Sequence, residues 1–331
     1  MPPRSAAGME QDAARSGRHW GGCVTALVVI VVVGGLLTLG AFWVYHKVTG
    51  LPLFSETGCT VVAPSAGSGS VSLDLDQAQN ASTIAAVGIK LGVPVYGVEI
   101  AEATAIQESK LVNIDYGDRD SLGLFQQRPS QGWGTAQQIM DPVYSSTAFY
   151  NALVGISGWQ QMSVTAAAQA VQNSGDPNAY AQHVTEAAVL ASVFSGTAGA
   201  GVTCSLGGPS FPTQTKSPSA LLTTRGQTLL DTMRYQFGDS NVGSVTGIAA
   251  SGLSFGVSVP GSVTGTQATQ LAWAYANWSA AQAAYLGVAQ VTCGGSSWTD
   301  TSGTNGWSSA SSGGTATAGS SPVTIAVVSG S

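Results

Sequence analysis

Apolar residues recur at helical spacing over much of the first two thirds of the chain, and this pattern predicts a set of amphipathic helices. The Ala-rich segments that carry the pattern lie at residues 76–92, 98–111, 141–156, 163–175 and 178–194. Asp141 followed by Pro142 is typical of a helix start, because Asp caps free backbone N–H groups and proline fits the first helical position. These segments predict one mostly helical domain over residues 59–204.

Composition changes after the last of these helices. Residues 205–223 are rich in Pro, Gly, Ser and Thr, as linkers are. Apolar patterning returns over residues 224–303, where a helical segment precedes strand-like residues, and predicts a small α+β domain of unknown role. We expect the Gly/Ser-rich tail, residues 304–331, to be flexible, although residues 322–328 could add an edge strand.

The N-terminal region contains an apolar run long enough to cross a membrane. Residues 21–45 carry no charged side chain, and about 20 apolar residues suffice to span a bilayer as a helix. We expect a transmembrane helix here, after a cytoplasmic segment at residues 1–20. A cleaved signal peptide is the alternative, but its apolar region is usually shorter.

The charges that flank the run predict its orientation. Arg4, Arg15 and Arg18 precede it, and only Lys47 follows it closely. By the positive-inside rule, the chain is expected to be a single-pass protein of the cell membrane, with a cytoplasmic N-terminus and extracellular C-terminal domains.

Charge also narrows the classes of partner. Only 8% of residues are charged and the formal net charge is −6, whereas about 25% of residues are charged in an average soluble domain. Residues 48–331 carry seven basic and fifteen acidic residues. Because acidic surfaces repel phosphate backbones, we expect no nucleic-acid partner.

The cysteines follow the same division of the chain. Cys23 lies in the apolar run, whereas Cys59, Cys204 and Cys293 lie in the part expected outside the membrane, where disulfides persist. Cys59 and Cys204 bracket the helical segments, and we predict a disulfide between them that closes the domain. Spacing alone leaves other pairings open, so the state of Cys293 stays undetermined.

Glu108 is a carboxylate on the apolar face of a predicted helix. On a helical wheel drawn at 100° per residue it shares a side with alanine, valine and leucine positions, whereas Glu99, Glu102 and Lys110 fall on a side expected to be solvated. A carboxylate among apolar neighbours is expected to hold a proton near neutral pH, as a general acid must. The alternative is a glutamate at a frayed helix end whose head group reaches solvent.

The segments around Glu108 resemble a known family. The ES pair at residues 108–109, followed by GLFQ at residues 123–126, is similar to the ES and GLMQ signature of lysozyme-like lytic transglycosylases. The whole run QESKLVNIDYGDRDSLGLFQQRPSQGWGT resembles a stretch of actinobacterial membrane and secreted proteins of this superfamily. Residues 141–153 resemble the family's DPxxNIxxGxxYL segment, and residues 170–180 resemble its AYNAGPGxVxxY segment.

The resemblance covers roughly residues 73–204 and implies roles for individual residues. Glu108 takes the place of the catalytic acid, and Gln126 takes that of the glycan-binding glutamine. Tyr180 takes the place of the tyrosine in the cleft, and Asn173 matches the asparagine of the family's YNAG motif. Gln172 stands where the family has tyrosine, so the wall of the cleft departs from the family pattern. Polar and aromatic neighbours that can contact sugars complete the candidate substrate-binding set: Gln127, Ser121 and Trp133.

Three aspartates, Asp115, Asp118 and Asp120, lie in the same run. They do not form the twelve-residue calcium loop, which ends in a bidentate glutamate. One of them is a candidate second catalytic carboxylate, since inverting glycosidases hold two carboxyls about 6.5–9.5 Å apart around a water. The alternative is a polar turn in which Arg119 pairs with a neighbour.

Other catalytic plans fit poorly. A histidine-based zinc site or a Ser-His-Asp triad in the expected extracellular domains would have only His183 to build on, and we expect His183 to be an ordinary helix residue. We therefore predict no metal and no cofactor.

Together these features predict a mainly α protein, with a lysozyme-like helical catalytic domain after an N-terminal transmembrane helix and a small α+β C-terminal domain. The predicted activity is cleavage of the β-1,4 glycan strands of peptidoglycan by a single catalytic glutamate, as in lytic transglycosylases. A muramidase-type hydrolase is the alternative chemistry. The alternative class is a non-catalytic peptidoglycan-binding or scaffold protein of an envelope, conjugation or secretion machine, with an envelope-spanning complex as its partner.

Overall fold

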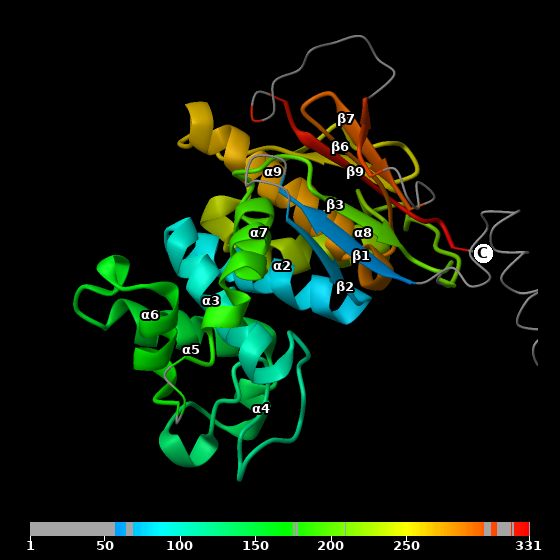
Figure 1. The fold of residues 1–331 in the computed structure, drawn as a ribbon. Helices are drawn as coiled ribbons and strands as arrows, with labels where there is room; N and C mark the ends of the chain where they lie inside the picture. The colour runs from blue at the N-terminus through cyan, green and yellow to red at the C-terminus, as the bar shows by residue number, and fades with distance from the viewer. Residues whose placement is uncertain are drawn as a thin grey trace, which may run out of the picture. The chain divides into compact units, whose positions relative to one another are not determined.

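The structure is a computed structural model that describes residues 57–63, 69–174, 176, 178–208, 210–300, 306–309, 319 and 321–330 (Figure 1). The predicted transmembrane span and the segment before it lie outside these residues. None of the helices in the described part is long and apolar enough to cross a membrane.

The prediction of a mainly α fold is wrong. Helices make up 46% and strands 15% of the described residues, and the strands form two antiparallel sheets. The predicted fold also began with a transmembrane helix, for which the described residues give no support. The missed strands that flank the first helical part are only four or five residues long, too short for their alternation to stand out in the sequence.

More of the described residues lie in helices than in strands. The α-helices of the described residues are α2 (Leu75–Lys90), α3 (Val95–Ser109), α4 (Ala136–Ile139), α5 (Pro142–Val154), α6 (Val164–Gln172), α7 (Val184–Phe194), α8 (Thr224–Phe237), α9 (Gly265–Ala281) and α10 (Ala283–Leu286). Short 3-10 helices are η1 (Pro129–Gln131), η2 (Trp159–Gln161), η3 (Ala181–His183) and η4 (Asp239–Asn241).

Local capping determines where several of these helices begin and end. The predicted start of α5 is confirmed, because the Asp141 carboxylate accepts a hydrogen bond from the Val143 N–H at 2.9 Å and Pro142 is the first helical residue. Helix α3 follows Pro94 and ends at Ser109, and the C-cap Lys110 breaks the helical repeat with a left-handed conformation (φ 56°). This ending turns the chain away directly after Glu108 and Ser109.

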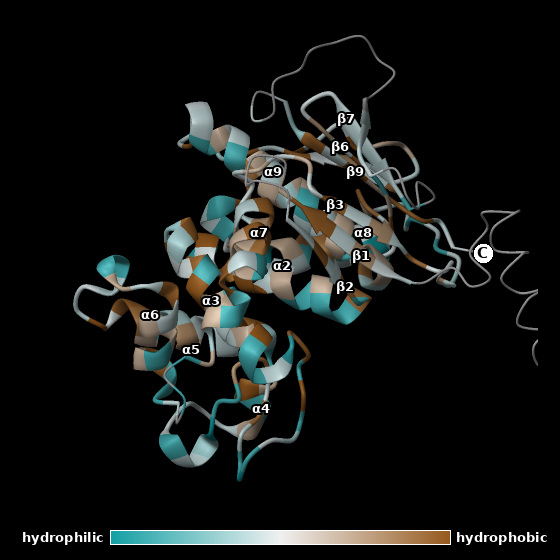
Figure 2. Cartoon of the chain, in the orientation of Figure 1, coloured by the Kyte–Doolittle hydropathy of each residue, from teal (hydrophilic) through white to brown (hydrophobic). Residues whose placement is uncertain are grey.

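Helix α3 is the central helix of this part. It packs against α2, α5, α6 and α7. Its small residues Gly97, Ala101 and Ala105 are buried and allow close approach of the surrounding helices. Helix α7 is largely apolar, as its colouring in Figure 2 shows, and Val189 and Leu190 are among its buried residues.

The first sheet has strand order β2-β1-β3, from β1 (Gly58–Val62), β2 (Ser70–Leu73) and β3 (Val202–Ser205). Strands β1 and β3 are antiparallel with Cys59 opposite Cys204, and the two residues form a disulfide. The predicted disulfide is therefore confirmed, and it joins the two ends of the helical segment across paired strands. Cys293 is free and buried.

The second sheet lies in the C-terminal part and has strand order β4-β5-β9-β6-β7-β8. Its strands are β4 (Val245–Thr246), β5 (Ser254–Val257), β6 (Val288–Cys293), β7 (Ser296–Thr299), β8 (Ser308–Ser309) and β9 (Val323–Val327). Strand β9 pairs with both β5 and β6, so the segment that we expected at a sheet edge is an interior strand. Its alternate residues Val323, Ile325 and Val327 are buried.

The C-terminal part shares a core with the first part. From Glu56 to Ser331 the chain forms one compact unit, and one cluster of buried apolar residues runs through both parts. Helix α9 packs on α2 and α7. The aromatic residues Tyr275 and Trp278 of α9 are fully buried and belong to this core.

Removal of the disulfide should destabilise the fold strongly. The bond joins residues 145 positions apart, for which chain entropy gives about 4–5 kcal/mol as an upper value. We expect the Cys59→Ala, Cys204→Ala double variant to unfold at a clearly lower urea concentration than the parent protein, monitored by circular dichroism. Addition of reductant should shift the parent midpoint toward that of the variant and leave the variant unchanged. Equal midpoints of the oxidised parent and the variant would contradict a stabilising role.

Candidate functional site

Glu108 and Tyr180 meet at the C-terminal end of α3. The Tyr180 hydroxyl donates a hydrogen bond to Glu108 Oε1 at 2.8 Å. Tyr180 is fully buried, whereas Glu108 is only partly buried. Among the described residues no hydrogen-bond donor contacts Glu108 Oε2. One oxygen of the carboxyl group is thus held by a buried donor and the other is available to a ligand.

Tyr180 remains a phenol in this contact. Burial, followed by the negative charge of Glu108, raises the pKa of the Tyr180 hydroxyl well above its ordinary value. The hydroxyl therefore keeps its proton at physiological pH and acts as a permanent donor. Tyr180 lies directly before η3, which packs against α3, so the contact depends on the return of the chain from α6 toward α7.

The GLFQ segment at residues 123–126 is fastened beside Glu108. The Ser109 hydroxyl donates to the Leu124 carbonyl at 2.8 Å, and the Gln172 amide donates to the Phe125 carbonyl at 2.8 Å. Phe125 is fully buried and stacks on Phe149, with ring centroids 4.7 Å apart. Gln172, which departs from the family pattern, therefore links the end of α6 to the segment beside Glu108.

Gly123 and Gly117 are required by this loop. Gly123 has φ 74°, and a Cβ atom there would lie 2.8 Å from the Ile139 carbonyl oxygen. A Cβ atom on Gly117 would lie 1.9 Å from Oε1 of Gln126. A larger residue at Gly123 would collide with the backbone at Ile139, and one at Gly117 would also meet the Ser121 carbonyl oxygen at 2.8 Å, so either change would distort the loop.

The two glutamines of the loop serve mainly to shape it. Gln126 donates from its amide to the carbonyls of Tyr116 and Gly123, both at 3.3 Å. Gln127 is 1% exposed and donates to the Ser145 carbonyl at 3.0 Å, so its side chain faces the interior. Ser121 is buried too, and its N–H closes a turn to the Asp118 carbonyl.

The three aspartates have different surroundings. Asp120 accepts hydrogen bonds from the Arg128 guanidinium at 2.9 Å and from the Ser130 N–H at 2.8 Å, and these bonds hold its pKa well below the ordinary range. Asp118 is exposed and lies 3.8 Å from the guanidinium of Arg119. Asp115 is exposed as well. The hydrogen bonds of Asp120 thus connect the loop to η1.

Asn173 and Trp133 occupy positions at helix and loop ends. Asn173 is exposed and caps α6 in a left-handed conformation (φ 50°). Trp133 is partly buried against the core. Neither side chain forms a hydrogen bond to Glu108 in the part of the chain that the structure describes.

Sequence reasoning missed Tyr116, an aromatic residue on the same loop. Its side chain is 69% exposed, in a chain whose other large aromatic residues are mostly in the core. Exposed aromatic rings are common contacts for sugars and other flat ligands. The signal was present in the sequence, because Tyr116 stands alone among the polar residues between Asp115 and Asp120.

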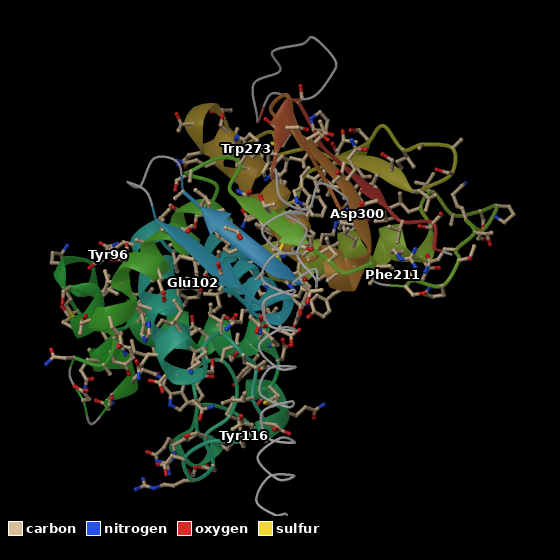
Figure 3. The ribbon with its side chains drawn as sticks, turned by 45° about the vertical axis from the view of Figure 1, so that its right-hand side comes forward. Tyr96, Glu102, Tyr116, Phe211, Trp273 and Asp300 are labelled. Atoms are coloured by element: carbon tan, nitrogen blue, oxygen red, sulfur yellow. A yellow bond between two sulfur atoms is a disulfide. The ribbon has the colours of Figure 1, made fainter. Side chains whose placement is uncertain are left out.

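The helical wheel was wrong for Glu102. Its side chain is 0% exposed, and both carboxyl oxygens lack a hydrogen-bond partner among the described residues. The wheel assumes a helix with one solvated side, whereas α3 is covered by helices on several sides. Burial raises the pKa of the Glu102 carboxyl well above its ordinary value, so the group is held as a neutral acid. Figure 3 shows Glu102 within the group of helices, whereas Tyr116 lies on an outlying loop.

Within the described ranges, no group of three or more His, Cys, Asp or Glu side chains is arranged to bind an ion.

Comparison with known proteins adds no relative. No protein-family model matches the chain, and no curated protein is significantly similar to it.

Glu102 should make the stability of the protein depend on pH. The folded state holds the Glu102 proton more tightly than the unfolded chain does. The contribution of this proton to the free energy of unfolding is therefore complete below the unfolded pKa of 4.5 and is lost as the pH rises. The loss amounts to at most about 1.4 kcal/mol per pH unit until the folded pKa is reached. We expect urea unfolding at pH 5 and pH 8 to give a larger drop in stability for the parent than for Glu102→Met.

The matched control for this prediction is Glu99→Gln on the same helix. Glu99 is only half buried and its pKa is raised less, so its replacement should change the pH dependence less than that of Glu102. The same slope of stability against pH in the parent and in Glu102→Met would show that Glu102 does not titrate as a buried acid.

Proposed function

We propose that the chain cleaves the β-1,4 glycan strands of peptidoglycan, with Glu108 as its catalytic acid. The observation that carries the proposal is the 2.8 Å contact from the buried Tyr180 hydroxyl to the partly exposed Glu108 carboxyl. These two residues are 72 positions apart and are the two that the resemblance to lytic transglycosylases singled out as acid and cleft tyrosine. A structural glutamate at a helix end would not require a buried phenol directed at it.

The surroundings of the aspartates favour a mechanism with one carboxyl group. Asp120 is engaged by Arg128 and Ser130, and Asp115 and Asp118 are exposed on the loop. Because Asp120 is already engaged, the substrate's own hydroxyl is the nucleophile that we propose. This favours the transglycosylase chemistry over the muramidase-type hydrolysis.

The proposed reaction uses Glu108 twice. The protonated carboxyl gives its proton to the glycosidic oxygen while the bond from that oxygen to the muramyl anomeric carbon breaks. The resulting carboxylate then accepts the proton of the muramyl 6-hydroxyl, whose oxygen bonds to the anomeric carbon and closes a 1,6-anhydro ring. Tyr180 holds Glu108 Oε1 throughout, so that Oε2 is the oxygen that carries the proton.

The disulfide supports action outside the cytoplasm. Cys59 and Cys204 form a bond that oxidising compartments maintain and that the cytosol reduces. Peptidoglycan is located in such a compartment, which agrees with the proposed substrate.

Glu108→Gln should abolish most of the activity. Glutamine keeps the size of the side chain and can still accept the Tyr180 hydrogen bond, but it has no proton to transfer. We expect turnover of purified peptidoglycan to fall at least ~100-fold, the lower end for general acid catalysis, with unchanged thermal unfolding. Mass analysis of the parent's products should find 1,6-anhydro ends, whereas reducing ends would assign hydrolysis. Release of fragments by Glu108→Gln at the parent rate, or no release by the parent, would favour a non-catalytic peptidoglycan-binding protein.

Tyr180→Phe should lower turnover without removing the acid. Loss of one hydrogen bond to a charged group corresponds to about 1.5–3 kcal/mol, or roughly 10- to 100-fold in rate if it is felt in the transition state. Because Tyr180 acts through Glu108, the change should have little further effect in the Glu108→Gln background. Additive losses in the double variant would show that Tyr180 does not work through Glu108.

A further inference from the structure

A pocket of about 400 Å³ opens beside the C-terminal end of α3, and Glu108 is not among its lining residues. Its walls come from β2, α2, α3, η3 and α7. The volume is within the usual range for ligand sites of about 300–1,000 Å³. It is therefore large enough for a few residues of a peptide.

The pocket runs along the open edge of the first sheet. Strand β2 is the outer strand of the order β2-β1-β3, so one row of its backbone groups has no strand partner in the described part of the chain. Val71, Ser72 and Leu73 all line the pocket. Consecutive side chains of a strand point to opposite faces, so a pocket that touches all three residues follows the backbone edge. Such an edge can receive an extended peptide as an added strand.

Polar groups are already arranged in the pocket. The side-chain oxygen Oε1 of Gln107 accepts a hydrogen bond from the side-chain amide of Gln182 at 3.1 Å and lies 3.0 Å from His183 Nε2. The amide nitrogen of Gln107 has no acceptor among the described residues and can donate to a peptide carbonyl. His183, which we had expected to be an ordinary helix residue, thus belongs to a polar cluster.

The pocket also presents charges of both signs. Lys110 is exposed and forms no salt bridge with any described residue, so its ammonium group can meet a carboxylate. Glu186 is 53% exposed and lies 3.7 Å from His183 Nδ1. Apolar Ile106 and Leu111 complete the lining and suit small methyl side chains. The lining therefore matches a short peptide with small apolar residues, carboxylates and an amine.

We infer that this pocket binds the peptide stem carried by the glycan strand that Glu108 cleaves. The inference rests on the proposed function, because the two segments that form the pocket's polar cluster also carry the proposed catalytic contact. Gln107 precedes Glu108, and Gln182 follows Tyr180 by two positions. A strand that reaches Glu108 would thus bring its attached peptide close to the edge of β2. Lys110 would pair with a carboxylate of the stem and Glu186 with the amine of its diamino acid.

A binding experiment on the full-length chain tests the pocket without catalysis. The probe is the sugar-free pentapeptide L-Ala-γ-D-Glu-L-Lys-D-Ala-D-Ala, titrated by isothermal calorimetry. We expect the parent and Glu108→Gln to bind it equally, and the Lys110→Gln, Glu186→Gln double variant to bind roughly tenfold more weakly. Lys110→Arg should retain binding. Lys216→Gln, a lysine outside the pocket, is the matched control and should bind like the parent.

A second measurement connects the pocket to turnover. The substrates are peptidoglycan strands with their stems and the same strands stripped of peptide by an amidase. The double variant should raise KM for the first substrate alone and leave kcat unchanged.

The outcomes separate the inference from the proposed function. If the pentapeptide fails to bind, or binds the double variant as well as the parent, the inference is overturned while Glu108-dependent cleavage can stand. If the pentapeptide binds as expected but the parent cleaves no glycan, the proposed function is overturned and the peptide site stands.

Discussion

Enclosure of α3 by four other helices is the constraint on which the candidate site depends. The packing of α2, α5, α6 and α7 around this helix leaves Val98, Ala101 and Ala105 with at most 1% exposure, so the helix cannot rotate or slide without opening the core. Its last turn is therefore held in one position. The hydrogen bond from the Ser109 hydroxyl to the Leu124 carbonyl holds the following loop against this last turn.

The same enclosure requires support from the C-terminal part. Helix α9 packs on α2 and α7, which are two of the four helices around α3. The buried Asn277 amide donates to the Val193 carbonyl at 2.9 Å and so joins α9 to the last turn of α7. Gln282, at the end of α9, accepts from Gln79 at 3.1 Å and reaches α2. Residues after Cys204 thus belong to the framework that holds Glu108.

Sequence patterns that extend over one or two helical turns predicted the helices well and the long-range contacts poorly. The helical segments were found because apolar spacing and capping act within a few residues, as at Asp141 and Pro142. The sheet order could not be predicted, because β9 enters between β5 and β6 from the far end of the chain. A Pro- and Ser-rich composition at residues 205–223 suggested separation, but composition does not show that the chain folds back onto the same core.

The candidate site was also predicted only in part. Glu108 was proposed from its helix face and from the resemblance together, whereas Tyr180 was proposed from the resemblance alone. The contact between the two residues was not predicted, because it joins positions 72 residues apart. Gln127 had the right chemistry for a sugar contact but faces Ser145 in the interior. A sequence shows which side chains have suitable chemistry, but the direction in which each one points is set by the packing around it.

Glu102 and Glu108 show how the position of a carboxyl group along an enclosed helix determines its surroundings. Along the covered length of α3, the carboxyl of Glu102 is shielded from solvent and has no hydrogen-bond donor among the described residues, so its neutral form is favoured. At the end of the helix, the carboxyl of Glu108 meets a buried donor on one oxygen and keeps the other accessible. An acid that must exchange protons with a substrate needs both conditions at once, because the donor fixes its position and the open oxygen does the chemistry. Only the end of such a helix offers them together, and this is the physical reason to assign the proposed catalysis to Glu108 instead of the more deeply buried Glu102.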